Sequence, residues 1–526
     1  MKFNTKRAPR ALLRLPYLPI LIAPFILFSP VLFTGKSLFW GTPALQFHPW
    51  RAFAWETLRA GHLPLWNPLV GMGAPLAANY QSAFFYPPGW IYFILAALGG
   101  EAAMAWGQAL LVGIHLTLAG VGMAVLVREL GLGVLSQTIS GLAFGLSGYL
   151  AARSHFLSIN AAAAWLPWVL WGTYRLVNSR KSAGTRKNSI LPPSLSLSSL
   201  SLSSLSLSSL SLSLFVSFLL LAGHAQMAWY TLLLAGMWAG FWGWRIAYSQ
   251  TNPKDGGRGM LLEGIREVAR AWLVLLVPVL LGVGLAAVQL IPTAELLLQS
   301  QRGGGANYDF VMTYSFWPWR FLGYLVPDLF GNPARGDYWG YANYWEDAVY
   351  VGLLPFLLAL RAIFDRKKPA AQKSLVRFLL VLLVVTFVLA LGQNTPVFPW
   401  LYRRVPTFNL FQAPARYTIW ATFVFVLLAG YGAETWKRPI GPKARFRTIR
   451  WIVAAIAIVI AALAAGVIVP DIQPSFVRAT ALAGAFGIGA GVLTLFAPKP
   501  SPLSPLPSLS PLSPLPSLSP ISPLPS

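Results

Sequence analysis

Long stretches without a charged residue dominate the chain. Residues 60–100, 102–127, 154–174, 189–244, 271–294, 378–402 and 451–470 contain no Asp, Glu, Lys or Arg. Each stretch is long enough for the roughly 20 apolar residues that cross about 30 Å of hydrocarbon as a helix. A single span in lipid must satisfy its own backbone hydrogen bonds, and the short alternating segments of a membrane barrel are absent. The pattern predicts an all-α polytopic membrane protein.

About 12 apolar runs, within a range of 11–13, are the predicted transmembrane helices of a membrane domain that covers 15–497. They are 15–34, 102–126, 135–152, 158–174, 211–223, 226–244, 271–291, 348–363, 377–393, 417–434, 451–470 and 479–497. A further apolar run, 84–99, is interpreted as a re-entrant or interfacial segment. If it were a full span, the basic cluster at 175–187 would face outward, against the positive-inside rule.

The distribution of basic residues predicts the orientation. The basic segment 1–14 precedes the run 15–34, which we interpret as an uncleaved signal anchor with a cytoplasmic N-terminus. With twelve spans, most of the 40 Lys and Arg residues face the cytoplasm and the C-terminus lies there too. The net charge of +25 is then a sign of topology and of contact with anionic lipid. We expect no nucleic-acid partner.

Composition narrows the chemistry and marks two low-complexity segments. The chain is 56% hydrophobic and 10% charged, and it contains no Cys, which excludes disulfides and Cys-ligated metals. Residues 194–214 form a Ser/Leu insert, and the Pro/Ser/Leu-rich tail 498–526 is predicted to be disordered, because frequent Pro prevents regular structure. Repeat expansion, without a functional role, is the preferred interpretation of both.

Three large extracytoplasmic loops, 35–101, 292–347 and 393–416, follow from this topology. Long ordered loops tend to carry function. Residues 50–60 of the first loop predict an amphipathic helix in the interface plane. Trp50, Phe53, Ala54 and Leu58 share one face, while Arg51, Glu56 and Arg59 form the polar side. His48, His62, His155 and His224 all fall on the outer side or at its boundary, whereas His115 lies within a span and is expected to be a packed core residue.

Outward Arg residues oppose the usual charge bias, and the planar fork of Arg suits phosphate recognition. Contact with lipid headgroups is the competing interpretation of these residues. For the outer amides and His62, loop packing competes equally with ligand contact. Carboxylates collect in the second loop, with Asp328, Glu346 and Asp347 among them.

Several short strings, taken together, resemble the bacterial YfhO-like membrane proteins. They are LRAGHLPLWNP at 58–68, GAPL at 73–76, NYQSAFFYPP at 79–88, AAWLPW at 163–168, LAGHAQ at 221–226, VPDLFG at 326–331, YVGLLP at 350–355 and FNLFQAPAR at 408–416. Their order extends from about residue 15 to 435, most of the chain. The resemblance implies a GT-C-like glycosyltransferase in the bacterial cytoplasmic (inner) membrane. Such an enzyme moves a sugar from a polyprenyl-phosphate donor to a cell-envelope polymer or lipid acceptor on the outer face.

That resemblance implies a general base for the acceptor hydroxyl and Arg residues for the carrier phosphate. GT-C enzymes usually carry an acid early in the first outer loop, but the string WGTPALQFHP at 40–49 contains none. The catalytic candidates are therefore Glu56 and His48, followed by Asp328, Glu346 and Asp347. The candidates for binding the sugar and the phosphate are His62, Trp66, Asn67, Asn79, Gln81, His155, His224, Gln226, Arg320 and Arg416. Gln412 stands where relatives are expected to carry Arg.

Two other functions remain open. One is a transporter or flippase for a lipid-linked substrate, although the central parts of the spans lack the ionisable group of most ion-coupled carriers and no inverted repeat is visible. The other is a non-catalytic scaffold, which the missing acid at 40–49 favours. No cofactor is expected, and the spacing of Asp, Glu and His supports no metal site, although a divalent metal stays compatible with these residue types.

Overall fold

The computed structural model describes residues 17–38, 41–184, 207–250, 256–301, 303–341, 343–436, 442–468 and 473–495. The basic segment 1–14, most of the Ser/Leu insert and the Pro-rich tail 498–526 lie outside these residues. From residue 207 onward the Ser/Leu insert is helical and continues into the following apolar run.

The described part of the chain is helical apart from one pair of two-residue strands. The first half contains the α-helices α1 (Leu18–Leu27), α2 (Ser29–Leu32), α3 (His48–Arg59), α4 (Ile91–Glu129), α5 (Val134–Gly145), α6 (Gly148–Ala151), α7 (Leu157–Ala164), α8 (Leu166–Gly184), α9 (Leu207–Leu221) and α10 (Ala225–Gln250). Strands β1 (Trp66–Asn67) and β2 (Ala74–Pro75) pair antiparallel in the first large loop.

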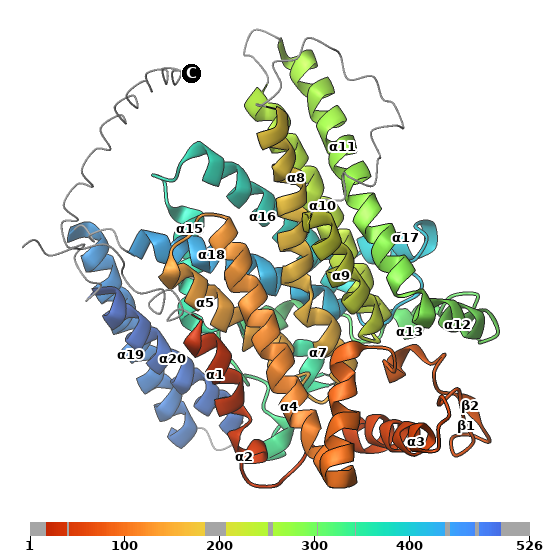
Figure 1. Cartoon of the computed structure of the whole chain (residues 1–526). Helices are drawn as coiled ribbons and strands as arrows, with labels where there is room; N and C mark the ends of the chain where they lie inside the picture. The colour runs from red at the N-terminus through yellow and green to blue at the C-terminus, as the bar shows by residue number, and fades with distance from the viewer. Residues whose placement is uncertain are drawn as a thin grey trace, which may run out of the picture.

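The second half has helices and loops but no strand among its described residues. It contains α11 (Gly256–Leu285), α12 (Ala287–Leu298), α13 (Tyr308–Met312), α14 (Tyr344–Asp347), α15 (Leu353–Phe364), α16 (Ala370–Ala390), α17 (Val397–Arg404), α18 (Thr418–Trp436), α19 (Pro442–Ile468) and α20 (Pro474–Leu495). Figure 1 shows α3 and the strand pair at one end of the bundle, together with α12 and α13.

Every predicted span overlaps at least one helix, but the lengths differ from those expected. Six helices of the described residues are long and apolar enough to cross a membrane: Pro87–Glu129, Gly257–Leu285, Ala370–Ala390, Pro414–Trp436, Arg445–Ile468 and Pro474–Leu493. The other apolar runs form shorter helices, such as α1 and α15, or are interrupted, as between α5 and α6. The fold is therefore all-helical with several candidate spans.

Helix α18 forms the centre of the bundle. All its residues from Thr418 to Ala433 are buried, and it packs against α5, α15 and α16. Helices α4 and α5 cross closely at small residues, because a Cβ on Gly145 would lie 2.7 Å from the Leu116 carbonyl oxygen. Such small residues let helix backbones approach each other closely in membranes.

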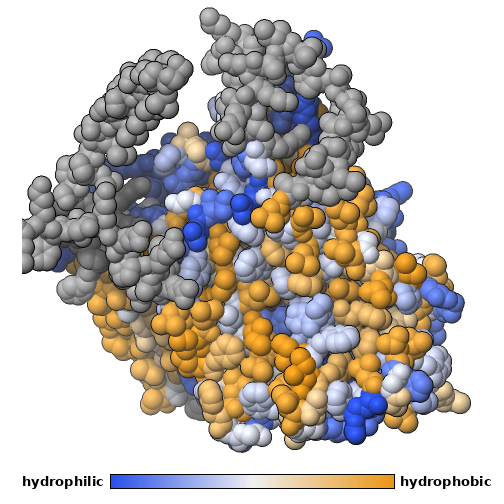
Figure 2. All heavy atoms as spheres, in the orientation of Figure 1, coloured by the Kyte–Doolittle hydropathy of each residue, from blue (hydrophilic) through white to orange (hydrophobic). Residues whose placement is uncertain are grey.

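Helices α19 and α20 differ from this centre. They pack mainly against each other at the edge of the bundle, with a smaller contact between α20 and α15 (Figure 1). Apolar side chains such as Trp451, Ile460 and Phe486 are exposed along them. Figure 2 also shows wide apolar areas on the face that it draws. A surface of this kind is stable where it faces lipid, as expected for a membrane protein.

The first large loop contains the predicted amphipathic helix. Helix α3 covers the predicted segment almost residue for residue, and its apolar side packs around Ala54. The apolar run 84–99 is not a straight span of its own. It begins with a 3₁₀ turn (Pro87–Trp90), continues as helix from Ile91, and breaks at Gly99 and Gly100, where the backbone leaves helical geometry. Its interpretation as a re-entrant segment stays a prediction.

Candidate functional site

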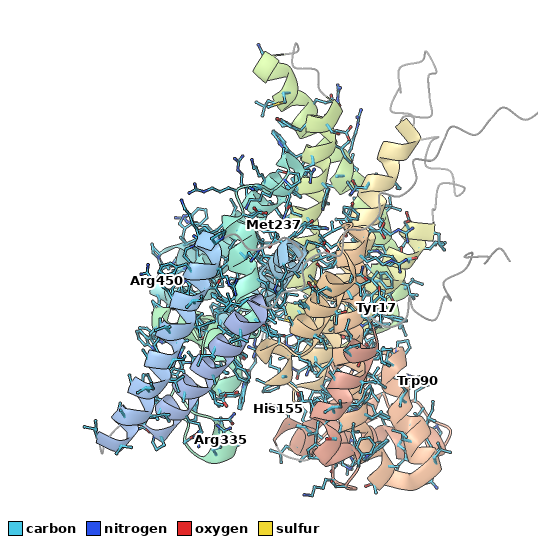
Figure 3. The ribbon with its side chains drawn as sticks, turned by 90° about the vertical axis from the view of Figure 1, so that its left-hand side faces the viewer. Tyr17, Trp90, His155, Met237, Arg335 and Arg450 are labelled. Atoms are coloured by element: carbon cyan, nitrogen blue, oxygen red, sulfur yellow. The ribbon has the colours of Figure 1, made fainter. Side chains whose placement is uncertain are left out.

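Polar side chains from distant parts of the chain meet at one end of the bundle. The turn after α6 contributes Arg153, α10 contributes Gln226, α14 contributes Glu346, and the 3₁₀ turn Pro414–Tyr417 before α18 contributes Arg416. Figure 3 shows His155 and Arg335 in the lower part of the molecule, away from Met237. Three of the predicted site residues, Gln226, Glu346 and Arg416, are thus brought together.

Glu346 lies at the centre of this group, and both of its carboxylate oxygens are paired. Oε1 accepts hydrogen bonds from Nε and Nη2 of Arg416 at 2.9 and 2.7 Å, and Oε2 accepts one from Nη2 of Arg153 at 2.9 Å. The Glu346 side chain is only 2% exposed. Asn343 caps α14 by accepting a hydrogen bond from the Glu346 amide, which fixes the start of this short helix. We call Arg153, Glu346 and Arg416 the Glu346 cluster.

A second layer holds the two guanidinium groups in place. The Gln226 side-chain oxygen accepts a hydrogen bond from Arg416 at 2.8 Å, and its amide donates to the Gln412 carbonyl at 2.6 Å. Arg153 donates to the Tyr149 carbonyl at 3.1 Å and lies 3.8 Å from the centre of the Tyr149 ring. The cluster therefore ties four separate chain segments into one rigid unit.

Electrostatics argue that Glu346 stays ionised and acts as a structural anion. Burial alone would raise the pKa of Glu346, but Arg416 and Arg153 outweigh it and lower this pKa to about 2. A carboxylate held in this way is a poor proton acceptor. The cluster carries two positive charges and one negative charge, so its two arginines are only half compensated by Glu346.

His155 and His224 border the cluster. The His155 ring packs against Phe156 and Trp345, with ring centres 4.1 and 4.8 Å apart. Burial and the nearby Arg153 lower the pKa of His155 to about 4, so this ring is neutral near pH 7. Nδ1 of His224 accepts a hydrogen bond from the Met227 amide at 3.2 Å, at the start of α10. Both histidines help to shape the protein around the cluster.

A second group of predicted residues lines a pocket beside α14, which we call the Asp328 pocket. Its wall includes Asp328, Tyr338, Tyr344 and Asp347. Oδ1 of Asp328 accepts a hydrogen bond from the Tyr344 hydroxyl at 2.6 Å. The Asp328 backbone has a φ of +54°, a left-handed conformation that is uncommon for a residue other than Gly. Strained backbone of this kind concentrates at functional sites.

Asp347 faces the same pocket but is held by a cation. It forms an ion pair with Arg320, and it accepts a hydrogen bond from the Tyr338 hydroxyl at 3.0 Å. Arg320 is buried and also donates to the Tyr341 carbonyl at 2.6 Å. Asp328 also accepts a hydrogen bond from the Asn332 amide at 3.1 Å, and the guanidinium of Arg335 lies 3.7 Å away, beyond direct hydrogen-bond distance. Of the two carboxylates, Asp328 is the more exposed, at 24% against 14% for Asp347.

Most candidates from the first large loop lie away from both sites. Glu56 is exposed and pairs with Arg59 at 3.1 Å, while Nε2 of His48 lies 3.9 Å from Glu101. Asn67 and Asn79 accept backbone hydrogen bonds within their own turns. Within the described residues, none of Glu56, His62, Trp66, Asn67 and Asn79 lines the Asp328 pocket or bonds to the Glu346 cluster. Gln81 accepts a hydrogen bond from Gln46 at 3.0 Å and borders another cavity.

Two candidate functional residues, Arg153 and Arg51, were not predicted from the sequence. Arg153 lies at the outer end of a predicted span, the position that singled out Arg416, so the same charge argument could have found it. Arg51 was assigned to the polar face of α3, but the structure turns it inward, against Tyr92. No group of three or more His, Asp and Glu side chains in the described ranges could hold a metal ion.

Comparison with known proteins shows which family the chain resembles. A family model described as bacterial membrane protein YfhO matches residues 208–505, more than half of the chain and the part that contains Gln226, Asp328, Glu346 and Arg416. Comparison with curated proteins and with solved structures finds no match. The family match covers the strings at 221–226, 326–331, 350–355 and 408–416, and it agrees with the apolar helices of the fold. The chain belongs to the YfhO family of bacterial membrane proteins.

Proposed function

We propose that this protein transfers a sugar from a polyprenyl-phosphate carrier to a cell-envelope acceptor on the outer face of the cytoplasmic membrane, with both termini in the cytoplasm. The observation that carries the proposal is the Asp328 pocket. It combines the partly exposed carboxylate of Asp328 with a second carboxylate and two tyrosines, at the end of a bundle with lipid-facing helices.

Asp328 is the proposed general base. The acceptor hydroxyl attacks the anomeric carbon of the sugar, its proton passes to an Asp328 oxygen, and the bond between the sugar and the phosphate oxygen breaks, releasing polyprenyl phosphate. Positioned proton transfer of this kind contributes roughly 10²- to 10⁴-fold to a rate. The Tyr344 hydroxyl orients Asp328, and Arg320 with Tyr338 orients Asp347 for contact with a sugar hydroxyl.

The Glu346 cluster has a supporting role in this proposal. Glu346 directly precedes Asp347 on α14, so anchoring Glu346 between Arg153 and Arg416 also fixes the far wall of the Asp328 pocket. The carrier phosphate, assigned to Arg320 and Arg416 from sequence, then meets two guanidinium groups that already have carboxylate partners. This arrangement leaves the phosphate contact in need of another cation.

The test is sugar transfer by the full-length protein in proteoliposomes that contain a polyprenyl-phosphate sugar with a labelled sugar. Asp328→Asn is expected to lower the transfer rate at least 100-fold. Asp309→Asn is the matched control, because Asp309 is exposed on the same loop and outside the pocket, and it should keep the wild-type rate. Equal rates for both variants would overturn the assignment. Movement of the lipid across the bilayer without sugar transfer would favour the flippase alternative.

A further inference from the structure

A separate cavity lies beneath the first large loop, enclosed by α3, the turn at 81–84, the start of α4 and α7. Its walls are mostly apolar and include Trp50, Phe93 and Leu111, with Gln81 and Asn160 among the few polar side chains. It shares no lining residue with the Asp328 pocket. We call it the Arg51 cavity, because Arg51 is the one Lys, Arg, Asp or Glu among its lining residues.

Arg51 is a half-buried cation without a carboxylate partner among the described residues. Its guanidinium carbon lies 3.7 Å from the centre of the Tyr92 ring and 5.4 Å from that of Phe47. No carboxylate of the described residues forms an ion pair with it, and its Nη1 is buried without a hydrogen-bond partner. On the same helix, exposed Arg59 pairs with Glu56 at 3.1 Å. A charged N–H group that is buried without a hydrogen-bond partner is unfavourable, so a fold that keeps one needs a reason.

Asn160 shows a complementary deficit in the same cavity. Its amide donates to the Arg153 carbonyl at 3.0 Å, but its side-chain oxygen is buried and accepts no hydrogen bond. His115 differs, since its two ring nitrogens meet the Tyr86 hydroxyl at 2.9 Å and the Leu111 carbonyl at 2.7 Å. The cavity thus has a cation that lacks an anion and an acceptor that lacks a donor. A phosphate group carrying a hydroxyl or an attached polar group supplies both.

The location of the cavity points to a lipid. The short helical segment before the break at Gly99 has two different sides. Tyr92 and Phe93 are buried and line the cavity, while Ile94 and Leu98 are 58% and 80% exposed. A helix with an apolar exposed side lies in the membrane interface with that side against the acyl chains. Its opposite side then lies near the level of the lipid headgroups. The apolar walls suit the glycerol or first chain carbons next to a phosphate.

We propose that the Arg51 cavity binds the phosphate-bearing headgroup of a membrane lipid, with Arg51 as the cation that neutralises the phosphate and Asn160 as an acceptor for a neighbouring donor. Two sources supply this chemistry: a phospholipid of the bilayer, or a polyprenyl phosphate. The inference does not rest on the proposed sugar transfer, because it concerns binding alone and residues outside the Asp328 pocket.

The test is lipid binding to the full-length, delipidated protein in neutral detergent, followed by native mass spectrometry. The probes are phosphatidylglycerol, a short-chain polyprenyl phosphate and inorganic phosphate, each titrated separately. Arg51→Gln is expected to weaken binding of the preferred lipid about tenfold or more, because it removes a charge-assisted contact. Arg51→Lys keeps the charge without the planar fork, so its lipid affinity should lie between that of the wild type and that of Arg51→Gln. Arg59→Gln is the control and should bind like the wild type.

Each probe and a stability measurement separate the outcomes. Preference for phosphatidylglycerol assigns a bilayer lipid, and preference for polyprenyl phosphate assigns a carrier lipid. Inorganic phosphate is expected to bind weakly, because it lacks the apolar part. The lipid-free Arg51→Gln protein should unfold at or above the wild-type temperature, because the buried, unpartnered N–H group of a cation is gone. Equal lipid binding by the Arg51→Gln and Arg59→Gln proteins, or loss of binding only through unfolding of Arg51→Gln, would overturn the proposal. Asp328→Asn should bind lipid normally even if it abolishes sugar transfer.

Discussion

Glu346 and Asp347 are neighbours in the sequence, but their side chains belong to two different regions. Glu346 points into a buried cluster where two arginines pair both of its oxygens. Asp347 lies on the wall of a pocket that it shares with Asp328. The Glu346 cluster is buried, with Glu346 2% exposed, whereas the Asp328 pocket is partly open, with Asp328 24% exposed.

The difference shows that the surroundings of a carboxylate decide whether it stabilises the fold or can contact a ligand, even within one loop. A carboxylate whose oxygens are both paired with buried cations holds chain segments together, because any loss of charge leaves an unpaired guanidinium. A carboxylate that is bonded to neutral groups and partly exposed, as Asp328 is beside Tyr344 and Asn332, can still be reached by a ligand. Variants in the first region should therefore change stability, and variants in the second should change activity.

The largest expected effect is on stability in the Glu346 cluster. Glu346→Gln removes the only carboxylate of the cluster and leaves Arg153 and Arg416 uncompensated in a buried place. We expect the free energy of unfolding to fall by roughly 3–5 kcal/mol. Thermal unfolding of the detergent-solubilised protein, with denaturant titration where it is reversible, measures the change.

Glu56→Gln is the matched control for this variant. Glu56 also pairs with an arginine, Arg59, but both partners are more than half exposed. Exposed pairs contribute about 0–1 kcal/mol, so this change should have little effect. If Glu346→Gln proves as mild as Glu56→Gln, the Glu346 cluster is not the anchor that the contrast with the Asp328 pocket requires.

The second-largest expected effect is the change in stability with pH that Glu346 causes. The pKa of Glu346 is lowered from the ordinary 4.5 to about 2, so the unfolded chain binds this proton more tightly than the folded protein does. The stabilisation is complete above about pH 4.5 and is lost as the pH falls toward 2, by up to about 3 kcal/mol. Unfolding temperatures between pH 6 and pH 3 should drop more steeply for the wild type than for Glu346→Gln. Parallel curves would contradict the paired state of Glu346.

Much of the fold was predictable because it depends on local patterns. Uncharged runs predicted helices wherever the structure has its long apolar ones, and spacings of three and four predicted α3. The lengths were not predictable to the same degree, since breaks such as the one between α5 and α6 depend on how other segments pack there. A helical pattern also shows which residues share a face but not what covers it. For this reason Arg51 was placed on a polar face, although Tyr92 covers it.

The candidate site was predictable in its residue types but not in its pairings. Gln226, Glu346 and Arg416 were predicted separately from the sequence. Along the chain, Glu346 lies 70 residues and Gln226 lies 190 residues before Arg416. Only the fold shows that they bind one another, which turns a proposed base and a proposed phosphate ligand into a structural ion cluster. The left-handed backbone of Asp328 has no signature in the string VPDLFG, because its conformation depends on the loop around it.

A smaller effect tests the second layer of the cluster. Gln226→Leu removes the acceptor for one Arg416 N–H and the donor to the Gln412 carbonyl, with similar side-chain volume. Leaving a buried charged donor without a partner should lower the free energy of unfolding by about 2 kcal/mol. Gln46→Leu, which breaks an exposed amide pair with Gln81, is the control and should cost less than about 0.5 kcal/mol. Thermal unfolding of the two variants side by side gives the comparison.

The smallest effect separates backbone strain from chemistry at Asp328. Asp328→Gly and Asp328→Ala both remove the carboxylate and its hydrogen bonds from Tyr344 and Asn332, so both should abolish sugar transfer equally. Their stabilities should differ, because a left-handed backbone costs Ala about 1–2 kcal/mol, while the greater freedom of Gly in the unfolded chain offsets roughly half of that. We expect the Gly variant to be more stable by roughly 0.5–1 kcal/mol in thermal unfolding. A more stable Ala variant would mean that residue 328 does not keep its φ of +54° in the membrane protein. A Gly variant that is more stable but inactive would show that the strained backbone at residue 328 is kept because the carboxylate is needed for activity. Glu346 has no such backbone strain.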